Sequence, residues 1–238
     1  MSDGKKERKG SAAVPAAVVG PSRPHFGTVT IRSRGRLPHW EMEGGIYFVT
    51  FRLEDSLPAA VCQQIRERKR RFEEAKRSGR KMAPKELETF AKLSSRHIEE
   101  LLDAGAGCCY MKDPRIAQIV AAAIQYWDDQ RYRQYAWCVM PNHVHSVFKP
   151  IGIHTLSSVM SSWKSYTVKP ANKLLARKGH FWEREYYDHL IRDDAELQRA
   201  IVYVRDNPIR AGLRDWPWVW CAGEDAARDS RRDGGATS

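Results

Sequence analysis

The sequence predicts an α+β fold, in which strands are mixed with packed helices. The segment from Gly45 to Leu53 alternates apolar and polar residues, as a strand with one buried face does. Two further apolar segments, Tyr132 to Val139 and His143 to Phe148, meet at the turn residues Met140-Pro-Asn142 and predict two adjoining strands. Long stretches with helical periodicity separate these strands, which is typical of the α+β class.

Helices are expected between and after these strands. The spacing of apolar residues predicts helices over residues 57–78, 84–103, 113–128 and 155–177. Prolines near the starts of the first and third of these helices suit an initial helical turn. The aromatic segment 180–191 predicts extended structure. With 238 residues the chain can bury one good core and does not need a second one.

The last predicted helix carries two polar residues that share a face. Asp193 or Asp194 is expected to cap its N-terminus, and Pro208 is expected to end it. Its buried stripe consists of Leu197, Ala200, Ile201 and Val204. Tyr203 lies at the edge of this stripe, and Asn207 follows four residues later on the same face. The pair predicts either a polar site on this face or a core tyrosine followed by a capping asparagine.

Both ends of the chain predict disordered tails, over residues 1–36 and 223–238, because they are polar and interrupted by glycine and proline. The apolar stretch 11–20 is too short and too broken by proline for a signal peptide, and no run of residues is long enough to cross a membrane. Five cysteines without metal-ligand spacing predict reduced thiols in a bacterial-type cytosol. A cytoplasmic, nucleoid-associated protein is therefore expected.

The charge of the chain favours an anionic partner. It contains 40 Lys and Arg against 29 Asp and Glu, a formal net charge of +11 and a pI near 9.5. Excess positive charge promotes nucleic-acid binding through counterion release, without specifying sequence or strand state. The densest basic run, Arg66 to Arg71, lies on a predicted helix, so it indicates either a DNA contact or a solvated face with i,i+4 charge pairs.

Two histidines, His143 and His145, lie on a predicted strand with one residue between them. Side chains at i and i+2 point to the same face, so the two imidazoles are expected side by side, with Cα atoms roughly 6–7 Å apart. Val144 and Phe148 then anchor the opposite face. This arrangement suits a divalent cation, and its alternative is a pair of half-buried histidines bonded to backbone or water.

Several motifs together resemble the REP-associated tyrosine transposases, a group of the single-tyrosine HUH transposases. The resemblance extends from about Leu37 to Trp220. Its motifs are Met140-Pro-Asn-His-Val-His145, Phe181-Trp-Glu-Arg-Glu-Tyr-Tyr-Asp-His189 and Tyr203-Val-Arg-Asp-Asn-Pro-Ile-Arg-Ala-Gly-Leu213, with Leu37-Pro-His-Trp and Tyr47-Phe-Val-Thr-Phe-Arg-Leu53 near the start. The motifs occur in the order expected for that family.

The resemblance implies a ferredoxin-like or RRM-like antiparallel sheet with helices packed on one face, within a domain at residues 37–222. The helical stretch between about residues 57 and 107 would be an elaboration of this plan. The implied activity is metal-dependent nicking and joining of single-stranded DNA through a covalent 5′-phosphotyrosine, on a hairpin-forming repeated element. His143, His145 and Asn207 would hold Mg²⁺ or Mn²⁺, and Tyr203 would be the nucleophile.

These residue types suit the implied chemistry. A cation held by two neutral imidazoles and an amide keeps its full charge, so it polarises a phosphodiester effectively. A phenol with a pKa near 10 is both a usable nucleophile and a fair leaving group when strands are rejoined. No general base is assigned from the sequence. Tyr186 and Tyr187 are rival nucleophiles, but they lack a ligand partner at helical spacing.

Further contacts with DNA are expected near this site. Arg184 and Arg192 are candidates for gripping phosphates, and Trp182 is a candidate for stacking on an unpaired base or, equally, for the core. The expected partner is single-stranded or hairpin DNA, with the protein acting as a monomer, and a dimer as the alternative. Two other functions remain: a nucleic-acid binding protein without cleavage, and a metal hydrolase that forms no covalent adduct.

Overall fold

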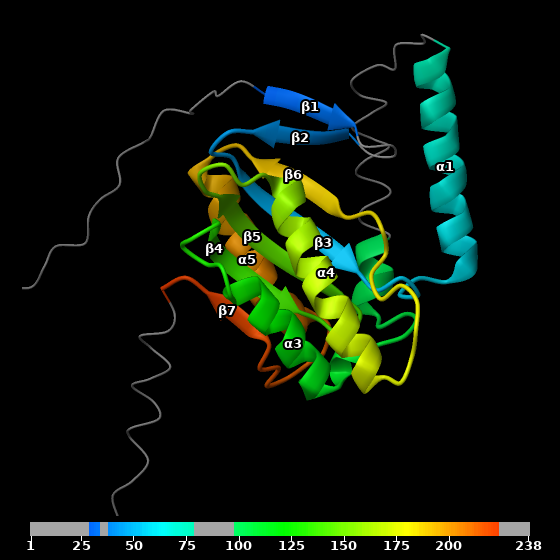
Figure 1. Cartoon of the computed structure of the whole chain (residues 1–238), viewed down its shortest axis with the longest axis vertical. Helices are drawn as coiled ribbons and strands as arrows, with labels where there is room; N and C mark the ends of the chain where they lie inside the picture. Colours follow the sequence, from blue (N-terminus) through cyan, green and yellow to red (C-terminus); the bar gives the residue numbers. More distant parts are fainter. Residues whose placement is uncertain (1–28, 34–37, 79–97, 224–238) are drawn as a thin grey trace, which may run out of the picture.

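The three predicted strands form the middle of a five-stranded antiparallel sheet. The computed structural model describes residues 29–33, 38–78 and 98–223. The strand order is β6-β3-β5-β4-β7 (Figure 1). The strands are β3 (Ile46–Arg52), β4 (Tyr132–Val139), β5 (His143–Pro150), β6 (Tyr187–Ile191) and β7 (Val219–Cys221). β4 matches its predicted bounds, and β5 extends two residues beyond its predicted end.

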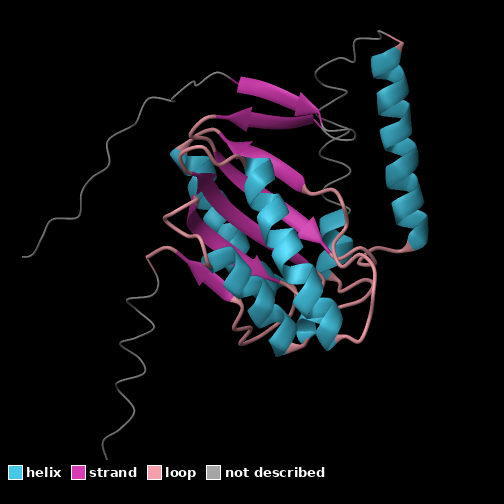
Figure 2. Ribbon diagram, viewed as in Figure 1, coloured by secondary structure: helices cyan, strands magenta, loops and turns pink. Residues whose placement is uncertain are grey.

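Two helices, α3 (Pro114–Gln125) and α4 (Leu156–Leu174), cover one face of the sheet. α3 precedes β4, and α4 connects β5 to β6. Figure 2 shows these two helices in cyan in front of the magenta strands of the sheet. Asp113 caps α3 by accepting a hydrogen bond from the Arg115 amide, and Thr155 caps α4 in the same way from Ser158. Without β7, the order β6-β3-β5-β4 with both helices on one face is the ferredoxin-like arrangement, so the predicted α+β class is confirmed.

A third helix, α5 (Asp194–Arg210), packs against the opposite face of the sheet. The alternation along β5 explains why both faces are covered. Val144 and Phe148 point into the core under α3 and α4, whereas Val147 joins Leu197 and Val204 of α5. The expectation that helices pack on one face of the sheet therefore holds for α3 and α4. It does not hold for α5, which packs on the opposite face.

α5 also continues beyond its predicted end. Pro208 lies inside the helix, which runs to Arg210. A proline in the last turn removes only one amide donor, and the helix then closes through the Ala211 amide on the Asn207 carbonyl, at 3.0 Å. The predicted extended segment 180–191 is a strand only in its last five residues, and β7 is too short to give a periodic signal.

The first part of the chain adds a hairpin and a helix to the five-stranded sheet and its packed helices. Strands β1 (Val29–Ser33) and β2 (Pro38–Met42) form an antiparallel hairpin. Residues 29–33 lie in the range predicted to be a disordered tail. That prediction is wrong for these residues, because they form strand β1. Helix α1 (Ala59–Arg77) projects from the body (Figure 1).

The segment before α3 crosses residues that are only partly described. Of the helix predicted over residues 84–103, only residues 98–103 are described, and they are helical. A short 3-10 turn, η1 (Tyr110–Lys112), then leads into α3. The predicted tail beyond residue 223 lies outside the described residues. Among the described helices, none combines the length and the apolar character needed to cross a bilayer.

Candidate active site and metal centre

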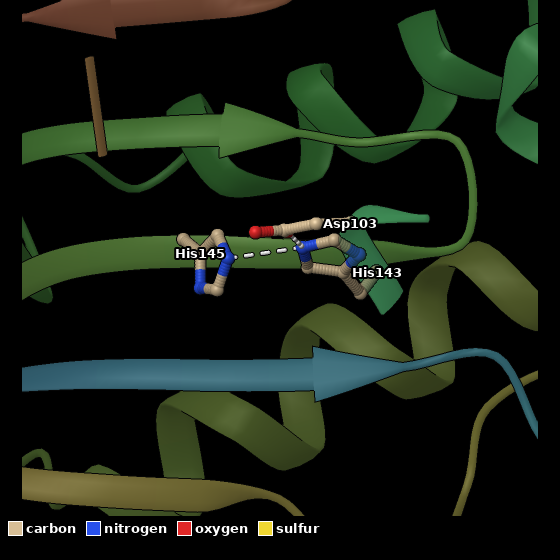
Figure 3. A group of neighbouring side chains, drawn as sticks. All are labelled: Asp103, His143 and His145. Atoms are coloured by element: carbon tan, nitrogen blue, oxygen red, sulfur yellow. Dashed lines mark hydrogen bonds and ion pairs between the residues drawn. The ribbon is translucent and has the colours of Figure 1, made fainter. Parts of the chain in front are cut away.

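His143 and His145 lie at the start of β5 with their rings turned toward α5. Both side chains are 0% exposed, and their Nε2 atoms are 2.9 Å apart (Figure 3). The strand period of two places both rings on one face, as the sequence predicts. Because burial lowers the pKa of both imidazoles, that of His145 to about 3, the rings are neutral at pH 7.

The other nitrogen of each ring is held by a neighbour. His145 Nδ1 lies 2.8 Å from Thr50 Oγ1, because Thr50 is paired with His145 across β3 and β5. His143 Nδ1 lies 2.7 Å from Asn142 Oδ1. Asn142 Nδ2 donates to the Ala106 carbonyl at 2.9 Å, so Oδ1 is the acceptor and His143 Nδ1 carries the hydrogen. This leaves the His143 Nε2 lone pair directed at the space between the rings, as metal-ligating histidines require.

Asp103 brings a carboxylate to the same space. Its Oδ1 lies 3.7 Å from His143 Nε2, and the ligand atoms of Asp103, His143 and His145 all lie within 4.8 Å of one another (Figure 3). Oδ1 is buried without a hydrogen-bond partner among the described residues, and burial raises the pKa of this carboxyl. An unpaired buried oxygen beside two lone-pair nitrogens fits a bound divalent cation.

Asp103 is not among the site residues predicted from the sequence. Its only local signal is the helical spacing of Glu99 and Asp103, which places two carboxylates on one face. Nothing in the sequence says that this face meets the histidine pair, because the approach depends on how residues 98–103 return to the sheet. The Asn142 bond to the Ala106 carbonyl, just after this segment, fixes that return.

α5 brings Tyr203 and Asn207 to the histidine pair. The Tyr203 ring centroid lies 5.3 Å from that of His145 and 5.7 Å from that of Phe48, both edge-on. Asn207 is 0% exposed and lies beside Tyr203 and Asp103. Neither amide atom of Asn207 has a hydrogen-bond partner among the described residues. The structure thus brings together the four residues that the sequence analysis singles out, and adds Asp103.

The electrostatic setting keeps the Tyr203 phenol protonated. Burial raises its pKa, and the nearby carboxylates of Glu99 and Asp103 raise it further. The Arg210 guanidinium, 5.1 Å from the centre of the Tyr203 ring, opposes this effect. Burial also raises the pKa of Glu99, to about 7. A cation at the histidine pair would offset this local excess of negative charge.

The rival tyrosines occupy other positions. Tyr186 packs against the core under α3 and α4, with Lys164 Nζ 5.4 Å from its ring centre. Tyr187 is 37% exposed, and its ring meets Phe48 at 6.5 Å. Phe48 therefore lies between Tyr187 and Tyr203, and of the two it is Tyr203 whose ring also contacts His145.

The three predicted DNA contacts fare differently. Trp182 is only 5% exposed, packs edge-on against Phe51 and donates from Nε1 to Thr167 Oγ1 at 2.7 Å. The tryptophan is thus a core residue, which leaves little of its ring surface for stacking on a base. Arg184 and Arg192 are exposed. They lie at opposite ends of β6, since Tyr187 pairs with Thr50 while Ile191 pairs with Ile46.

Arg70 belongs to the basic run of residues 66–71 on α1, and its side-chain contacts are described. Its guanidinium pairs with Glu67 at 2.7 Å and with Glu74 at 2.6 Å, one helical turn away on each side. These pairs are solvent-exposed, which favours the solvated-face interpretation over a dedicated DNA contact at this residue.

Comparisons with known proteins point in one direction. The family described as "Transposase IS200 like" matches residues 111–207. A putative REP-associated tyrosine transposase of Haemophilus influenzae is 27% identical over 101 residues, covering 37% of this chain and 57% of the relative. The REP-associated tyrosine transposase of Escherichia coli K12 is 26% identical over 102 residues, covering 41% and 59%. The matches thus span less than two thirds of these relatives' own lengths.

A solved structure described as a REP-associated tyrosine transposase bound to a REP hairpin is also similar, with a TM-score of 0.47 and 16% identity over 82% of this chain and 87% of the other. The family match includes the histidine pair, Tyr203 and Asn207, whereas Glu99 and Asp103 precede it. The family match and the two named relatives thus show that this chain is similar to IS200-like transposases over residues 111–207, and that REP-associated tyrosine transposases are among its relatives.

Proposed function

We propose that this chain cuts and rejoins single-stranded DNA next to a hairpin, through a covalent bond between Tyr203 and a 5′-phosphate. The observation that carries the proposal is the convergence of the Tyr203 ring on the buried histidine pair, at 5.3 Å from His145. A protein that only binds DNA has no need for a phenol at this position. The net charge of +11 suits a polyanionic partner.

Four residues are proposed to hold the divalent cation: His143, His145, Asp103 and Asn207. The support is chemical. Two imidazole nitrogens face each other, and a carboxylate oxygen and an amide lie unpaired beside them. This mixed nitrogen and oxygen set suits Mn²⁺ or Mg²⁺. When bound, the cation would polarise the scissile phosphate and stabilise the charge that develops there.

The chain's own residues would perform the remaining tasks. Thr50 and Asn142 hold the imidazoles in orientation through their Nδ1 atoms. Phe48 and His145 pack edge-on against the Tyr203 ring and restrict its orientation beside the histidine pair. A phosphate that reaches the cation would then meet the phenol at short range, which is the positioning that in-line attack requires.

A covalent capture experiment tests the proposal. Protein and Mn²⁺ are incubated with a pool of hairpin oligonucleotides that carry a randomised single-stranded flank and a 3′ label. A denaturing gel should show labelled protein, because the fragment 3′ to the cut stays attached through its 5′-phosphate. Tyr203→Phe should abolish this band, whereas Tyr187→Phe, a matched loss of one hydroxyl nearby, should leave it.

The other outcomes identify the alternatives. Retention of the hairpins without any labelled protein or shortened strand would indicate a binding protein that does not cleave. Shortened strands without a protein adduct would indicate a metal hydrolase. Either result would contradict the proposed function.

A further inference from the structure

A single stripe of α5 carries three polar side chains. Tyr203, Asn207 and Arg210 follow one another at i, i+4 and i+7, which places them on the same side of the helix. The first two are the proposed nucleophile and a proposed ligand of the cation. Arg210 lies in the last turn, beyond residue 207, where the family match ends.

The Arg210 guanidinium folds back over the Tyr203 ring. Its Cζ lies 5.1 Å from the ring centroid, within the range of a cation–π contact. The direction follows from the helix, because Cα–Cβ bonds tilt toward the N-terminus and a long side chain therefore lies over the preceding turns. The His145 ring centroid lies 5.3 Å from that of the same Tyr203 ring, so the guanidinium and the proposed cation site both adjoin the phenol.

The positive charge of Arg210 is not taken up by an ion pair. Among the described residues, no carboxylate lies within salt-bridge distance of its guanidinium, although Glu99 and Asp103 are near enough to attract it. Arg205 on the same helix differs, because its Nε donates to Asp206 Oδ1 at 2.7 Å. Arg210 is also exposed, so its fork of N–H donors is accessible to a ligand from solvent.

A helix C-terminus favours a cation, which is the structural alternative for this arginine. Its position over the Tyr203 ring is not explained by the helix end. A phosphorus atom bonded to the phenol oxygen lies two bonds from the ring that the guanidinium covers. The planar donors of arginine suit bidentate contact with the non-bridging oxygens of a phosphodiester. Because Arg210 adjoins the nucleophile itself, this contact would persist while the phosphate is bound to Tyr203.

We infer that Arg210 binds the non-bridging oxygens of the scissile phosphate while Tyr203 attacks it, and holds the phosphotyrosine until the strands are rejoined. The inference rests on the proposed function. In the forward step a bond forms between the phenol oxygen and phosphorus, and the phenol proton is released to water. The bond from phosphorus to the 3′-oxygen breaks, and that oxygen takes a proton from water. Arg210 keeps its protons throughout and offsets the negative charge that grows on the phosphate oxygens.

The test measures the rate of adduct formation with Mn²⁺ and a saturating amount of the 3′-labelled hairpin pool. Arg210→Ala should slow adduct formation about 100-fold or more, as the loss of a donor to a developing oxyanion does. Arg210→Lys keeps the charge but not the planar fork, so it should retain part of the rate. Arg205→Ala removes an arginine from another face of α5 and should react at the wild-type rate. Mn²⁺ titration and the urea unfolding midpoint should show that Arg210→Ala still binds the metal and folds.

A small guanidinium in solution separates contact with the phosphate from a merely structural role. Because Arg210 is exposed, its truncation leaves a site that ethylguanidinium can reach. Ethylguanidinium should restore part of the rate lost in Arg210→Ala and leave the rate of Arg205→Ala unchanged. An unchanged rate in Arg210→Ala, a loss of hairpin affinity alone, or a slow rate that ethylguanidinium does not raise would overturn the inference, while wild-type adduct formation upholds the proposed function. Absence of the wild-type adduct would overturn both.

Discussion

Thr50 offers a quantitative test of how the metal centre is held. Its hydroxyl is nearly buried and lies 2.8 Å from His145 Nδ1, on the strand next to the histidine pair. Thr50→Val keeps the branched shape that suits the strand and removes only the hydroxyl. His145 then loses the partner that orients its ring, although no proposed ligand is removed.

The expected effect falls mainly on the metal. Loss of such an outer contact weakens metal affinity by about 10- to 100-fold. At a Mn²⁺ concentration of about 100 times the wild-type Kd, the cation stabilises the folded wild type by about 2.7 kcal/mol. A 100-fold weaker site would retain only about 0.4 kcal/mol of that stabilisation under the same conditions. In the absence of metal, the lost hydrogen bond should reduce stability by about 1–3 kcal/mol.

Titration calorimetry with Mn²⁺ and urea unfolding with and without Mn²⁺ measure both quantities. Thr167→Val is the matched control, because Thr167 Oγ1 is also buried and accepts from Trp182, but it lies on α4 behind the other face of the sheet. It should lose stability and keep its metal affinity. Equal Mn²⁺ affinity in Thr50→Val and wild type would refute the orienting role of Thr50.

Three other perturbations have expected outcomes. Asn207→Leu removes a buried amide that lacks partners and should stabilise the metal-free protein by about 1–3 kcal/mol in urea unfolding while weakening Mn²⁺ binding; a destabilised variant would contradict this assignment. Glu99 has a folded pKa raised to about 7, so its contribution to stability is present below pH 4.5 and lost as pH rises through 7. With chelator present, Glu99→Gln should therefore match the wild type at pH 4 and be more stable by up to about 3 kcal/mol at pH 8, and an equal difference at both pH values would exclude this linkage. Lys164 Nζ contacts the carbonyl oxygens of Glu183, Arg184 and Glu185, so Lys164→Met should speed hydrogen exchange in residues 181–187, and unchanged protection there would show that this lysine is not needed.

The sequence predicts the strand and the helix that carry this site better than it predicts how they pack against each other. Strand alternation is a local property, so the shared face of His143 and His145 follows from two residues of spacing. The helical spacing of Tyr203 and Asn207 is equally local. That α5 crosses the face of the histidine pair depends on tertiary packing, in which Val204 meets Val147. Local periodicity carries no information on that contact.

Some features of the site needed the tertiary structure, for identifiable physical reasons. Trp182 has the sequence features of a stacking residue and those of a core residue alike, and its contacts with Phe51 and Thr167 favour the core alternative. Asp103 could not be assigned because its position beside the histidine pair depends on tertiary packing, in which Ala106 is held by Asn142, 36 residues further along the chain. Pro208 favours a helix end, but a proline in the final turn interrupts one hydrogen bond and the helix continues.

Peptide mapping of the covalent adduct tests the central claim most directly. Trypsin separates the candidate nucleophiles, because Tyr203 lies in the peptide Ala200 to Arg205, while Tyr186 and Tyr187 share the peptide Glu185 to Arg192. After nuclease trimming, mass spectrometry should find the nucleotide on the Ala200 peptide in wild type, and no nucleotide on either peptide in Tyr203→Phe. A nucleotide on the Glu185 peptide would contradict the account, because the attacking phenol would then not be the one beside His145.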